Sequence, residues 1–369
     1  MKICVFVPGD KLGGAEQYLK NITVYYLKNG DDVDVYFLKS KKYNGWEDLK
    51  LFSNLRLFYT TKFKESKGAL ALLKKILLIK TKYDYGFSSH VHLNCFLGFL
   101  RCFRLFNVKY IVSRESTTTH KRFKGMKLHL FNCGYKLFYK YLDLLICQSQ
   151  LMRDSLITNV PCLDQSVKVK VIPNPIILED IKSKLLEPIS DDIKCLGEFI
   201  VSAGRLIHLK GFDILIQSFA RLENKNLKLV LLGEGSDEEK LKLLALELGV
   251  SERVIFLGFV NNVYPYFKAA DACVVSSRIE GFPNVLLQMM MANENVVSTL
   301  CAGGIDDIDG LSLSKINDEE LLFLAIQNVL KNSPETKKNI RSLFDKELLG
   351  RDISVFIEKV NYFLNYEKI

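Results

Sequence analysis

Residues 272–291 combine an apolar run, a turn of small residues and a second apolar run in that order. Residues 272–275 (ACVV) are typical of a buried strand, Ser276 and Ser277 form the turn, and residues 285–291 (VLLQMMM) are typical of a buried helix. A strand that leads through a loop into a helix is the repeating unit of open α/β sheets. The first N–H groups and the positive dipole end of such a helix favour anions. The stretch therefore predicts an α/β fold with an anion-binding loop.

The same loop carries Glu280, a carboxylate beside a site that favours anions. A carboxylate in such a place needs a hydroxyl or a cation as its partner. Sugar hydroxyls would meet this need. The alternative is an ordinary buried strand, turn and helix with a solvated glutamate.

Two other loops repeat the pattern of strand, glycine and helix. Residues 8–16 (PGDKLGGAE) follow the apolar run 3–7 but lack the Gly-x-Gly-x-x-Gly and Walker patterns, so a tight turn without a ligand is one interpretation. Residues 204–212 (GRLIHLKGF) follow the apolar run 199–203 and place Arg205 and Lys210 between glycines. Arginine can bridge two phosphate oxygens and lysine supplies a point charge, so this loop suits a diphosphate.

The length of 369 residues is sufficient for two α/β domains. Residues 173–175 (PNP) interrupt all periodicity, because proline fixes its own backbone and restricts the preceding residue. We therefore expect an N-terminal domain of residues 1–174 and a C-terminal domain of residues 175–351. The tail, residues 352–369, has apolar positions at helical spacing and is expected to be a helix.

Charge is distributed unevenly along the chain. Residues 1–175 carry 29 of the 51 Lys and Arg residues but only 13 of the 42 Asp and Glu residues. Such a basic half is expected to face an anionic surface. Within it, residues 120–142 interleave lysines with aromatic and aliphatic residues, which suits a helix lying in a membrane interface. The alternative is a core helix with lysines outside; nucleic acid is not expected, because no binding motif accompanies the charges.

These motifs together resemble glycosyltransferase family 4, the retaining GT-B enzymes that use nucleotide sugars. The resemblance is carried by Glu280-Gly281-Phe282, by the Gly-Gly-Ala-Glu loop at 13–16, by Gly204-Arg205-Leu206 with Lys210-Gly211, and by Gly233-Glu234-Gly235. The family has a second glutamate eight positions after the first, where this chain has Gln288. An amide still accepts a hydrogen bond from a hydroxyl but carries no charge, so weaker ribose binding is expected.

The resemblance implies a GT-B fold, with two Rossmann-like domains facing across a cleft and the tail helix packing back on the first domain. It also implies roles for residues. Glu280 and His90 are expected to be catalytic, with His92 as the alternative histidine. The expected donor-binding residues are Gly14, Arg205, Lys210, Gly233, Gly235, Gly281, Phe282, Asn284, Leu286 and Gln288. Glu16, Arg114 and Glu115 are expected to contact the acceptor, although for the last two a surface ion pair is the alternative.

The implied reaction moves a hexose-type sugar from a nucleotide-diphosphate donor, expected to be a UDP-sugar, to a lipid-linked saccharide in O-antigen or other surface-polysaccharide synthesis. Retention at the anomeric carbon without a metal is expected. No apolar stretch reaches the ~18 residues of a membrane span, so a cytoplasmic protein on the inner face of the cytoplasmic membrane is expected. The alternatives are a sugar-nucleotide epimerase and a non-catalytic relative that only binds nucleotide sugars.

Overall fold

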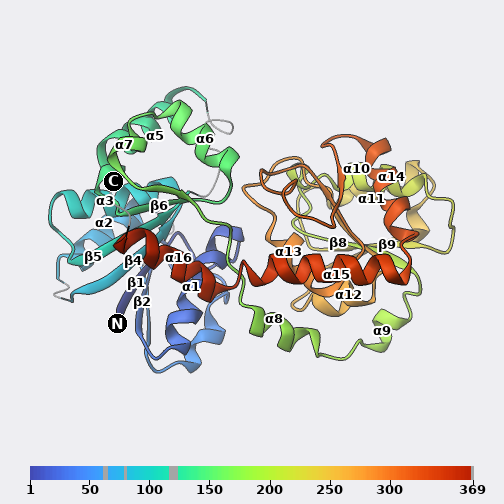
Figure 1. Ribbon diagram of the computed structural model, residues 1–369, viewed down its shortest axis with the longest axis horizontal. Helices are drawn as coiled ribbons and strands as arrows, with labels where there is room; N and C mark the ends of the chain where they lie inside the picture. The colour runs from blue at the N-terminus through green and yellow to red at the C-terminus, as the bar shows by residue number, and fades with distance from the viewer. Residues whose placement is uncertain (61–64, 79–80, 116–123, 367–369) are drawn as a thin grey trace. The chain divides into compact units, whose positions relative to one another are not determined.

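A computed structural model of the chain describes residues 1–60, 65–78, 81–115 and 124–366 (Figure 1). The chain divides into two compact units. Unit 1 comprises Met1–Ile176 and Arg351–Ile369, and unit 2 comprises Ile177–Gly350. Each unit contains one parallel sheet with helices on both faces, which confirms the predicted α/β fold class.

Unit 1 is built on a seven-stranded parallel sheet. Its strands are β1 (Lys2–Val7), β2 (Asp32–Phe37), β3 (Leu55–Tyr59), β4 (Tyr83–Ser89), β5 (Val108–Arg114), β6 (Leu144–Cys147) and β7 (Val169–Val171). Its helices are α1 (Gly14–Lys28), α2 (Glu65–Ile76), α3 (Val91–Cys102), α5 (Gly125–Phe138), α6 (Gln150–Asn159), α7 (Leu163–Ser166) and α16 (Ile353–Asn365), with the 3-10 turns η1 (Glu47–Leu51) and η2 (Tyr139–Tyr141).

Unit 2 is built on a six-stranded sheet. Its strands are β8 (Phe199–Ala203), β9 (Lys228–Leu232), β10 (Val254–Gly258), β11 (Ala272–Val275), β12 (Val296–Thr299) and β13 (Ser312–Ser314). Its helices are α8 (Leu178–Leu185), α9 (Asp191–Lys194), α10 (Phe212–Ala220), α11 (Glu238–Glu247), α12 (Tyr264–Ala269), α13 (Asn284–Ala292), α14 (Glu319–Leu330) and α15 (Pro334–Leu349), with the 3-10 turns η3 (His208–Lys210) and η4 (Ser251–Arg253). Helices α10, α11 and α14 cover one face of the sheet, and α12, α13 and α15 cover the other (Figure 1).

Both sheets have the strand order of a Rossmann fold. The order is β3-β2-β1-β4-β5-β6-β7 in unit 1 and β10-β9-β8-β11-β12-β13 in unit 2. The chain therefore leaves β1 and β4, and likewise β8 and β11, toward opposite sides of the sheet. The crevice at the carboxyl ends of such a strand pair is where open α/β sheets bind ligands.

The strands form because they are apolar along their whole length and are covered on both faces. All residues of β1 from Ile3 to Val7 are fully buried, as are Ala272, Cys273 and Val274 of β11. Hydrophobic cores of this kind hold the strand ends in place, and the loops that follow the strands are correspondingly well positioned.

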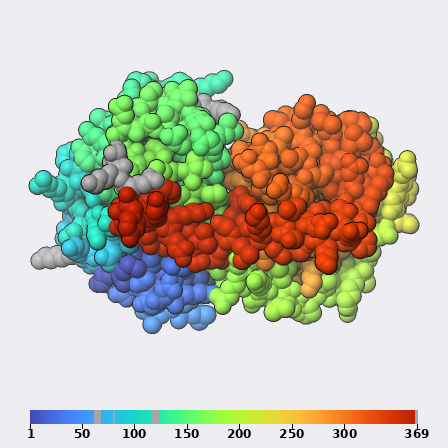
Figure 2. All heavy atoms as spheres, viewed as in Figure 1, coloured from blue at the N-terminus to red at the C-terminus, as the bar shows by residue number. Residues whose placement is uncertain are grey.

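The C-terminal helix α16 belongs to unit 1, although the chain reaches it only after completing unit 2. The backbone of Ile176 pairs with this returning segment, since its N–H donates to Arg351 O at 3.0 Å and its C=O accepts from Ile353 N at 2.8 Å. Phe356 packs edge-on against Tyr18 of α1, with ring centroids 5.7 Å apart. Figure 2 shows the helix, in red, at the surface of unit 1.

Candidate functional site

The carboxyl ends of β8 and β11 bring together two of the side chains predicted from the sequence. Lys210, at the end of the loop after β8, forms an ion pair with Glu280, in the loop after β11. The Lys210 and Glu280 side chains are 20% and 19% exposed, so the pair is largely withdrawn from water but open on one side. The partner that Glu280 requires is therefore supplied by the protein.

Hydrogen bonds to the backbone and to a hydroxyl hold this pair in place. Ser277 Oγ donates to Glu280 Oε1 at 3.1 Å, and the backbone N–H of Glu280 donates to Cys301 O at 2.9 Å. Ser276 Oγ donates to the backbone O of Lys210 at 3.0 Å, which joins the two loops directly. Because each loop is tied to the other, the carboxylate and the ammonium are preorganised.

Gly211 follows Lys210 and is required by the close approach of the two loops. Its φ of +63° lies in the left-handed region, and a Cβ at this position would lie 2.1 Å from Ser276 O. Only glycine avoids both the backbone strain and the overlap.

Arg278 was not singled out by the sequence, yet it locks the same loop. Its guanidinium binds the Asp213 carboxylate through two hydrogen bonds of 2.7 and 2.6 Å, and NH1 also donates to His208 O at 2.7 Å. Burial would raise the pKa of Asp213, but the hydrogen bonds and charge of Arg278 outweigh it, and the pKa lies below its ordinary value. No local pattern signals this contact, because the two residues are 65 positions apart.

Arg205 lies on the same loop as Lys210 but is exposed, and no hydrogen bond or ion pair holds its side chain within the described part of the chain. Gly233 and Gly235 have a packing role. A Cβ on Gly233 would lie 1.9 Å from Gly204 O, and one on Gly235 would lie 2.1 Å from Leu206 O. These two glycines let the loops after β8 and β9 pack backbone to backbone.

The predicted donor residues around the start of α13 differ in exposure. Gly281 and Asn284 are half-buried, and Phe282 is buried. Leu286 is fully buried, and its N–H donates to Pro283 O at 2.9 Å, so this structure does not support a donor contact through Leu286. Gln288 is half-buried and hydrogen-bonds Tyr264; burial raises the pKa of that tyrosine, and the hydrogen bond partly offsets the effect.

In unit 1, the carboxyl ends of β1 and β4 bring His90 and Glu16 together. His90 Nε2 lies 3.6 Å from Glu16 Oε1, and the two side chains are 25% and 16% exposed. His90 has a φ of +92°, which is strained for a non-glycine residue and is typical of functional sites. The second carboxylate oxygen of Glu16 accepts from Gly13 N at 3.2 Å, which caps α1, and Gly14 begins the helix and is exposed.

The loops after β1, β2 and β4 enclose a pocket of about 320 Å³, here called the unit 1 pocket. It is lined by Pro8, Gly9, Asp10, Lys11, Glu16, Lys39, Ser40, Lys42, Tyr43, His90 and His92. Both histidines weighed from the sequence therefore reach the same hollow. The other lining residues come from the loop after β1, the first turn of α1 and the loop after β2, and only the strand order brings them together.

Arg114 and Glu115 do not lie where an acceptor contact was expected. They are 2% and 1% exposed. Arg114 donates to Asn174 Oδ1 at 3.0 Å and stacks over the Tyr18 ring, while burial lowers its pKa to about 10; Glu115 accepts from Tyr139 Oη at 3.3 Å. Such burial leaves little of either side chain open to a bulky acceptor.

Helix α5 contains part of the segment predicted to lie in a membrane interface; residues 120–123 are outside the described residues. Tyr135 and Tyr139 are fully buried against α3 and the sheet, so they belong to the core. Met126, Leu130 and Leu137 are 78%, 65% and 57% exposed. No described helix has both the length and the apolar character needed to cross a bilayer.

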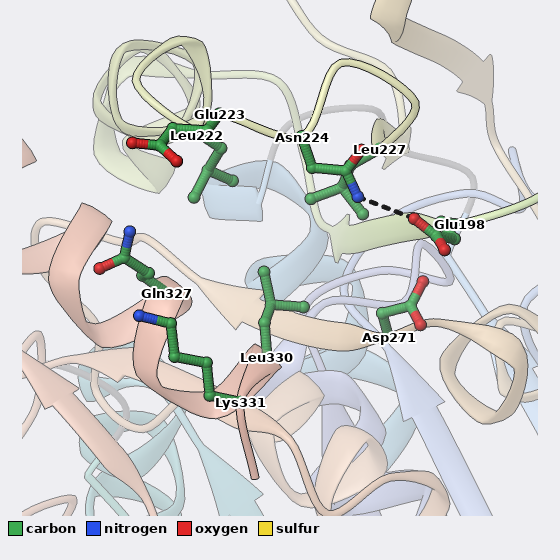
Figure 3. A pocket seen from close by; sticks show the side chains of 9 residues that line it. All are labelled: Glu198, Leu222, Glu223, Asn224, Leu227, Asp271, Gln327, Leu330 and Lys331. Atoms are coloured by element: carbon green, nitrogen blue, oxygen red, sulfur yellow. Dashed lines mark hydrogen bonds between the residues drawn. The ribbon is translucent and has the colours of Figure 1, made fainter.

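A further pocket, of about 350 Å³, lies at the opposite end of the unit 2 strands from Lys210 and Glu280 (Figure 3). Glu198 and Asp271 line it and immediately precede β8 and β11, so it adjoins the amino ends of the strands. Glu198 is held there by Asn224, whose Nδ2 donates to it at 2.8 Å. Within the described residues, no group of three or more His, Cys, Asp or Glu side chains is arranged to hold a metal.

Two family models match the chain. The model for glycosyl transferases group 1 matches residues 193–342, and the model for Glycosyltransferase Family 4 matches residues 12–180. Anabaena Alr3699/HepE in complex with UDP shares the fold with a TM-score of 0.79 and 20% identity, over 100% of both chains. The lipopolysaccharide outer core galactosyltransferase WaaB, in its apo form, has a TM-score of 0.67 and 19% identity, over 99% of both. The two Rossmann-like units therefore define a GT-B glycosyltransferase fold. Together the two family models span most of the chain and identify it as a glycosyltransferase of the family 4 type.

The curated relatives that match the chain are named as glycosyltransferases. The N-acetylgalactosamine-N,N'-diacetylbacillosaminyl-diphospho-undecaprenol 4-alpha-N-acetylgalactosaminyltransferase of Campylobacter jejuni is 34% identical over 227 residues, which cover 58% of this chain and 60% of the relative. An uncharacterized glycosyltransferase of Methanocaldococcus jannaschii, MJ1059, is 30% identical over 207 residues, 55% of this chain and 50% of the relative. The lipopolysaccharide core biosynthesis glycosyltransferase LpsE of Rhizobium meliloti is 36% identical over 138 residues, 36% of this chain and 40% of LpsE. The chain thus spans 60% or less of the length of these relatives.

Proposed function

We propose that this protein transfers a hexose-type sugar from a nucleoside-diphosphate donor to a lipid-linked saccharide in the synthesis of lipopolysaccharide or another surface polysaccharide. The observation that carries the proposal is the Lys210–Glu280 pair at the crevice between β8 and β11. A cation and a carboxylate side by side at this position suit a ligand that presents both phosphate oxygens and hydroxyls.

In this proposal Lys210 and Glu280 pair with each other when no donor is bound. When the donor binds, its diphosphate contacts the ammonium of Lys210 and the guanidinium of Arg205. The carboxylate of Glu280 then accepts hydrogen bonds from the sugar hydroxyls. Gln288 binds the ribose, and the amides of Gly281 and Phe282 stabilise charge on the leaving diphosphate. These cations and the start of α13 offset that charge, so the proposed reaction uses no metal.

The proposed chemistry retains the anomeric configuration. The bond between the anomeric carbon and the diphosphate oxygen breaks with its electron pair on the diphosphate. An acceptor hydroxyl bonds to the same face of the carbon, and its proton passes to the departing diphosphate. His90 and Glu16 are assigned to the acceptor side in unit 1.

The nature of the substrates is supported by relatives. Structures of Alr3699/HepE in complex with UDP and with UDP-glucose have been solved, which supports a UDP-sugar as the donor. The name of the Campylobacter relative specifies a diphospho-undecaprenol acceptor, and LpsE acts in lipopolysaccharide core biosynthesis. A lipid-linked saccharide acceptor follows from these by analogy.

A transfer assay with a panel of labelled UDP-sugars and bacterial membranes as acceptor tests the proposal. Glu280→Gln keeps the shape of the side chain and should lower kcat/KM by about 100-fold or more, because charge at the reacting sugar is lost. Arg205→Ala should also abolish most transfer, and its fold should be unaffected because the side chain is exposed. Glu198→Gln, at the opposite sheet edge, is the matched control and should retain activity.

If Glu280→Gln and Arg205→Ala both transferred sugar at the wild-type rate, the assigned site would be refuted. Release of free sugar from the donor without an acceptor would favour the epimerase. UDP binding without turnover on any acceptor would favour a non-catalytic binding protein.

We further propose that unit 1 rests on an anionic membrane surface through the exposed side of α5. Exposed lysines (124, 127 and 136) lie beside Met126 and Leu130 there, and this combination suits a headgroup layer. The double variant Met126→Glu and Leu130→Glu should reduce flotation with anionic vesicles about tenfold. Leu243→Glu with Leu246→Glu, two exposed leucines of α11, is the control. Equal flotation of all three proteins would contradict the assignment.

A further inference from the structure

The unit 1 pocket is rich in cations that come from different loops. Lys11 lies in the loop after β1, and Lys39 and Lys42 lie in the loop after β2. The ammonium groups of Lys11 and Lys42 lie 5.4 and 5.3 Å from the centroid of one ring, that of Tyr43. Two like charges gathered around one aromatic ring repel each other, and a bound anion would relieve that repulsion.

The acidic residues of the pocket form no ion pair with Lys11 or Lys42. Asp10 is 2% exposed, and its Oδ2 accepts the backbone N–H groups of Lys42 and Tyr43 at 3.1 and 2.7 Å. Within the described residues, neither Lys11 nor Lys42 has a carboxylate within ion-pair distance. The neighbouring Lys41 differs, because it pairs with Glu47 at 2.6 Å. The ammonium groups of Lys11 and Lys42 therefore lack, in the described part of the chain, the neighbouring carboxylate that neutralises Lys41.

The position of the pocket also favours a ligand. It lies at the carboxyl ends of β1, β2 and β4, and the crevice between β1 and β4 is where the strand order reverses. The hydrogen bonds that Asp10 accepts come from the backbone N–H groups of residues 42 and 43, so the loop is held in place without using the side chain of Lys42.

We propose that the unit 1 pocket binds a phosphoryl group of the acceptor, through Lys11 and Lys42. The inference rests on the proposed glycosyl transfer and deepens it. The accepting sugar is then one that stands next to a phosphate or diphosphate, and a neutral saccharide of the same structure is a poor acceptor. The phosphoryl group belongs either to a lipid-linked diphosphate or to a free sugar phosphate.

Binding of inorganic pyrophosphate, measured by isothermal titration calorimetry with the full-length protein saturated with UDP, tests the pocket directly. UDP occupies the cations of unit 2, so the remaining binding reports on unit 1. Lys42→Gln and Lys11→Gln should each weaken pyrophosphate binding by about threefold to tenfold, and the double variant should weaken it further. Lys41→Gln, on the same loop, is the matched control and should bind within about twofold of wild type.

The loop should keep its conformation in Lys42→Gln, because only the backbone of this residue contacts Asp10. Absence of pyrophosphate binding in the UDP-saturated wild type would overturn the inference. An equal loss in Lys41→Gln and Lys42→Gln would also overturn it.

Transfer to three acceptors separates the sources of the phosphoryl group. A short-chain lipid diphosphate, a sugar 1-phosphate and a neutral alkyl glycoside should carry the same sugar. If either phosphorylated acceptor has a lower KM than the glycoside, and this difference disappears in Lys42→Gln, the inference is supported and the source of the phosphoryl group is identified. Equal KM values for all three would overturn it while leaving the proposed function intact. Failure of UDP to bind would instead refute the proposed function.

Discussion

The ammonium of Lys210 and the carboxylate of Glu280 each neutralise a charge that the other would leave in a half-buried place. Removing one of two such partners costs more than the pair contributes, because the remaining charge stays desolvated. This explains why a carboxylate is tolerated close to the start of α13. The same argument applies to either partner, so Lys210→Ala and Glu280→Gln should each lower the free energy of unfolding as well as alter the site.

Also at the residue scale, Gly211 and Gly249 can be compared because both have a left-handed backbone. Their φ angles are +63° and +67°, but a Cβ on Gly211 would meet Ser276 O at 2.1 Å while one on Gly249 would have no atom within 4 Å. We expect Gly249→Ala to lower the free energy of unfolding by about 1 kcal/mol through strain alone. Gly211→Ala should lower it by roughly 2–4 kcal/mol and weaken UDP binding, because overlap adds to the strain. Urea denaturation of both variants measures the difference, and equal losses would contradict the close approach of the loops.

At the scale of elements, the Arg278–Asp213 contact connects the loop after β11 to the first turn of α10. Arg278 also donates from Nε to Asn317 Oδ1 at 2.6 Å, so three segments of unit 2 converge on one guanidinium. A bidentate contact of this kind fixes direction as well as distance. Thr299 Oγ1 donates to Ser277 O at 2.6 Å and supports the same loop from β12.

The contact predicts a specific acid sensitivity. Because the pKa of Asp213 is lower in the folded protein than its ordinary value of 3.8, the carboxylate stabilises the fold above that value. This stabilisation is lost as the pH falls through the lowered pKa. The free energy of unfolding should therefore fall more steeply below about pH 4 in wild type than in Asp213→Asn. Parallel curves for the two proteins between pH 5 and pH 3 would show that the contact contributes little.

At the scale of the whole molecule, two units of the same strand order each place charged side chains at the reversal of their sheet. Unit 2 has Lys210 and Glu280 there, and unit 1 has His90 and Glu16. The chain returns after unit 2 to complete unit 1 with α16, and Asn361 accepts from Tyr85 Oη of β4 at 2.9 Å. The stability of unit 1 therefore depends on both ends of the chain.

This arrangement predicts where UDP acts. Hydrogen exchange should slow in residues 204–211 and 276–288 when UDP is added, because these loops hold the proposed donor site. Saturation at 100 times Kd should raise the free energy of unfolding of unit 2 by about 2.7 kcal/mol. Inorganic phosphate at the same concentration is the control. If hydrogen exchange instead slows mainly around Glu198 and Asp271, at the amino ends of β8 and β11, the nucleotide binds in the pocket of Figure 3.

The sequence alone determined the elements and the residue types of the candidate donor site. Periodicity and apolar runs are local, so the strands now seen as β8 and β11 were predictable, as were the glycine loops that follow them. The need of Glu280 for a partner also follows from its neighbours in the chain. The family motifs identified the same loops.

Only the tertiary structure decided which partner each charged side chain has. Lys210 and Glu280 are 70 positions apart and meet because β8 and β11 are adjacent in the sheet. Arg114 and Glu115 are buried, and Tyr135 and Tyr139 belong to the core, because neighbouring elements cover them. Local pattern specifies what a segment is, whereas strand order and packing between distant segments determine which side chains remain accessible and what they contact.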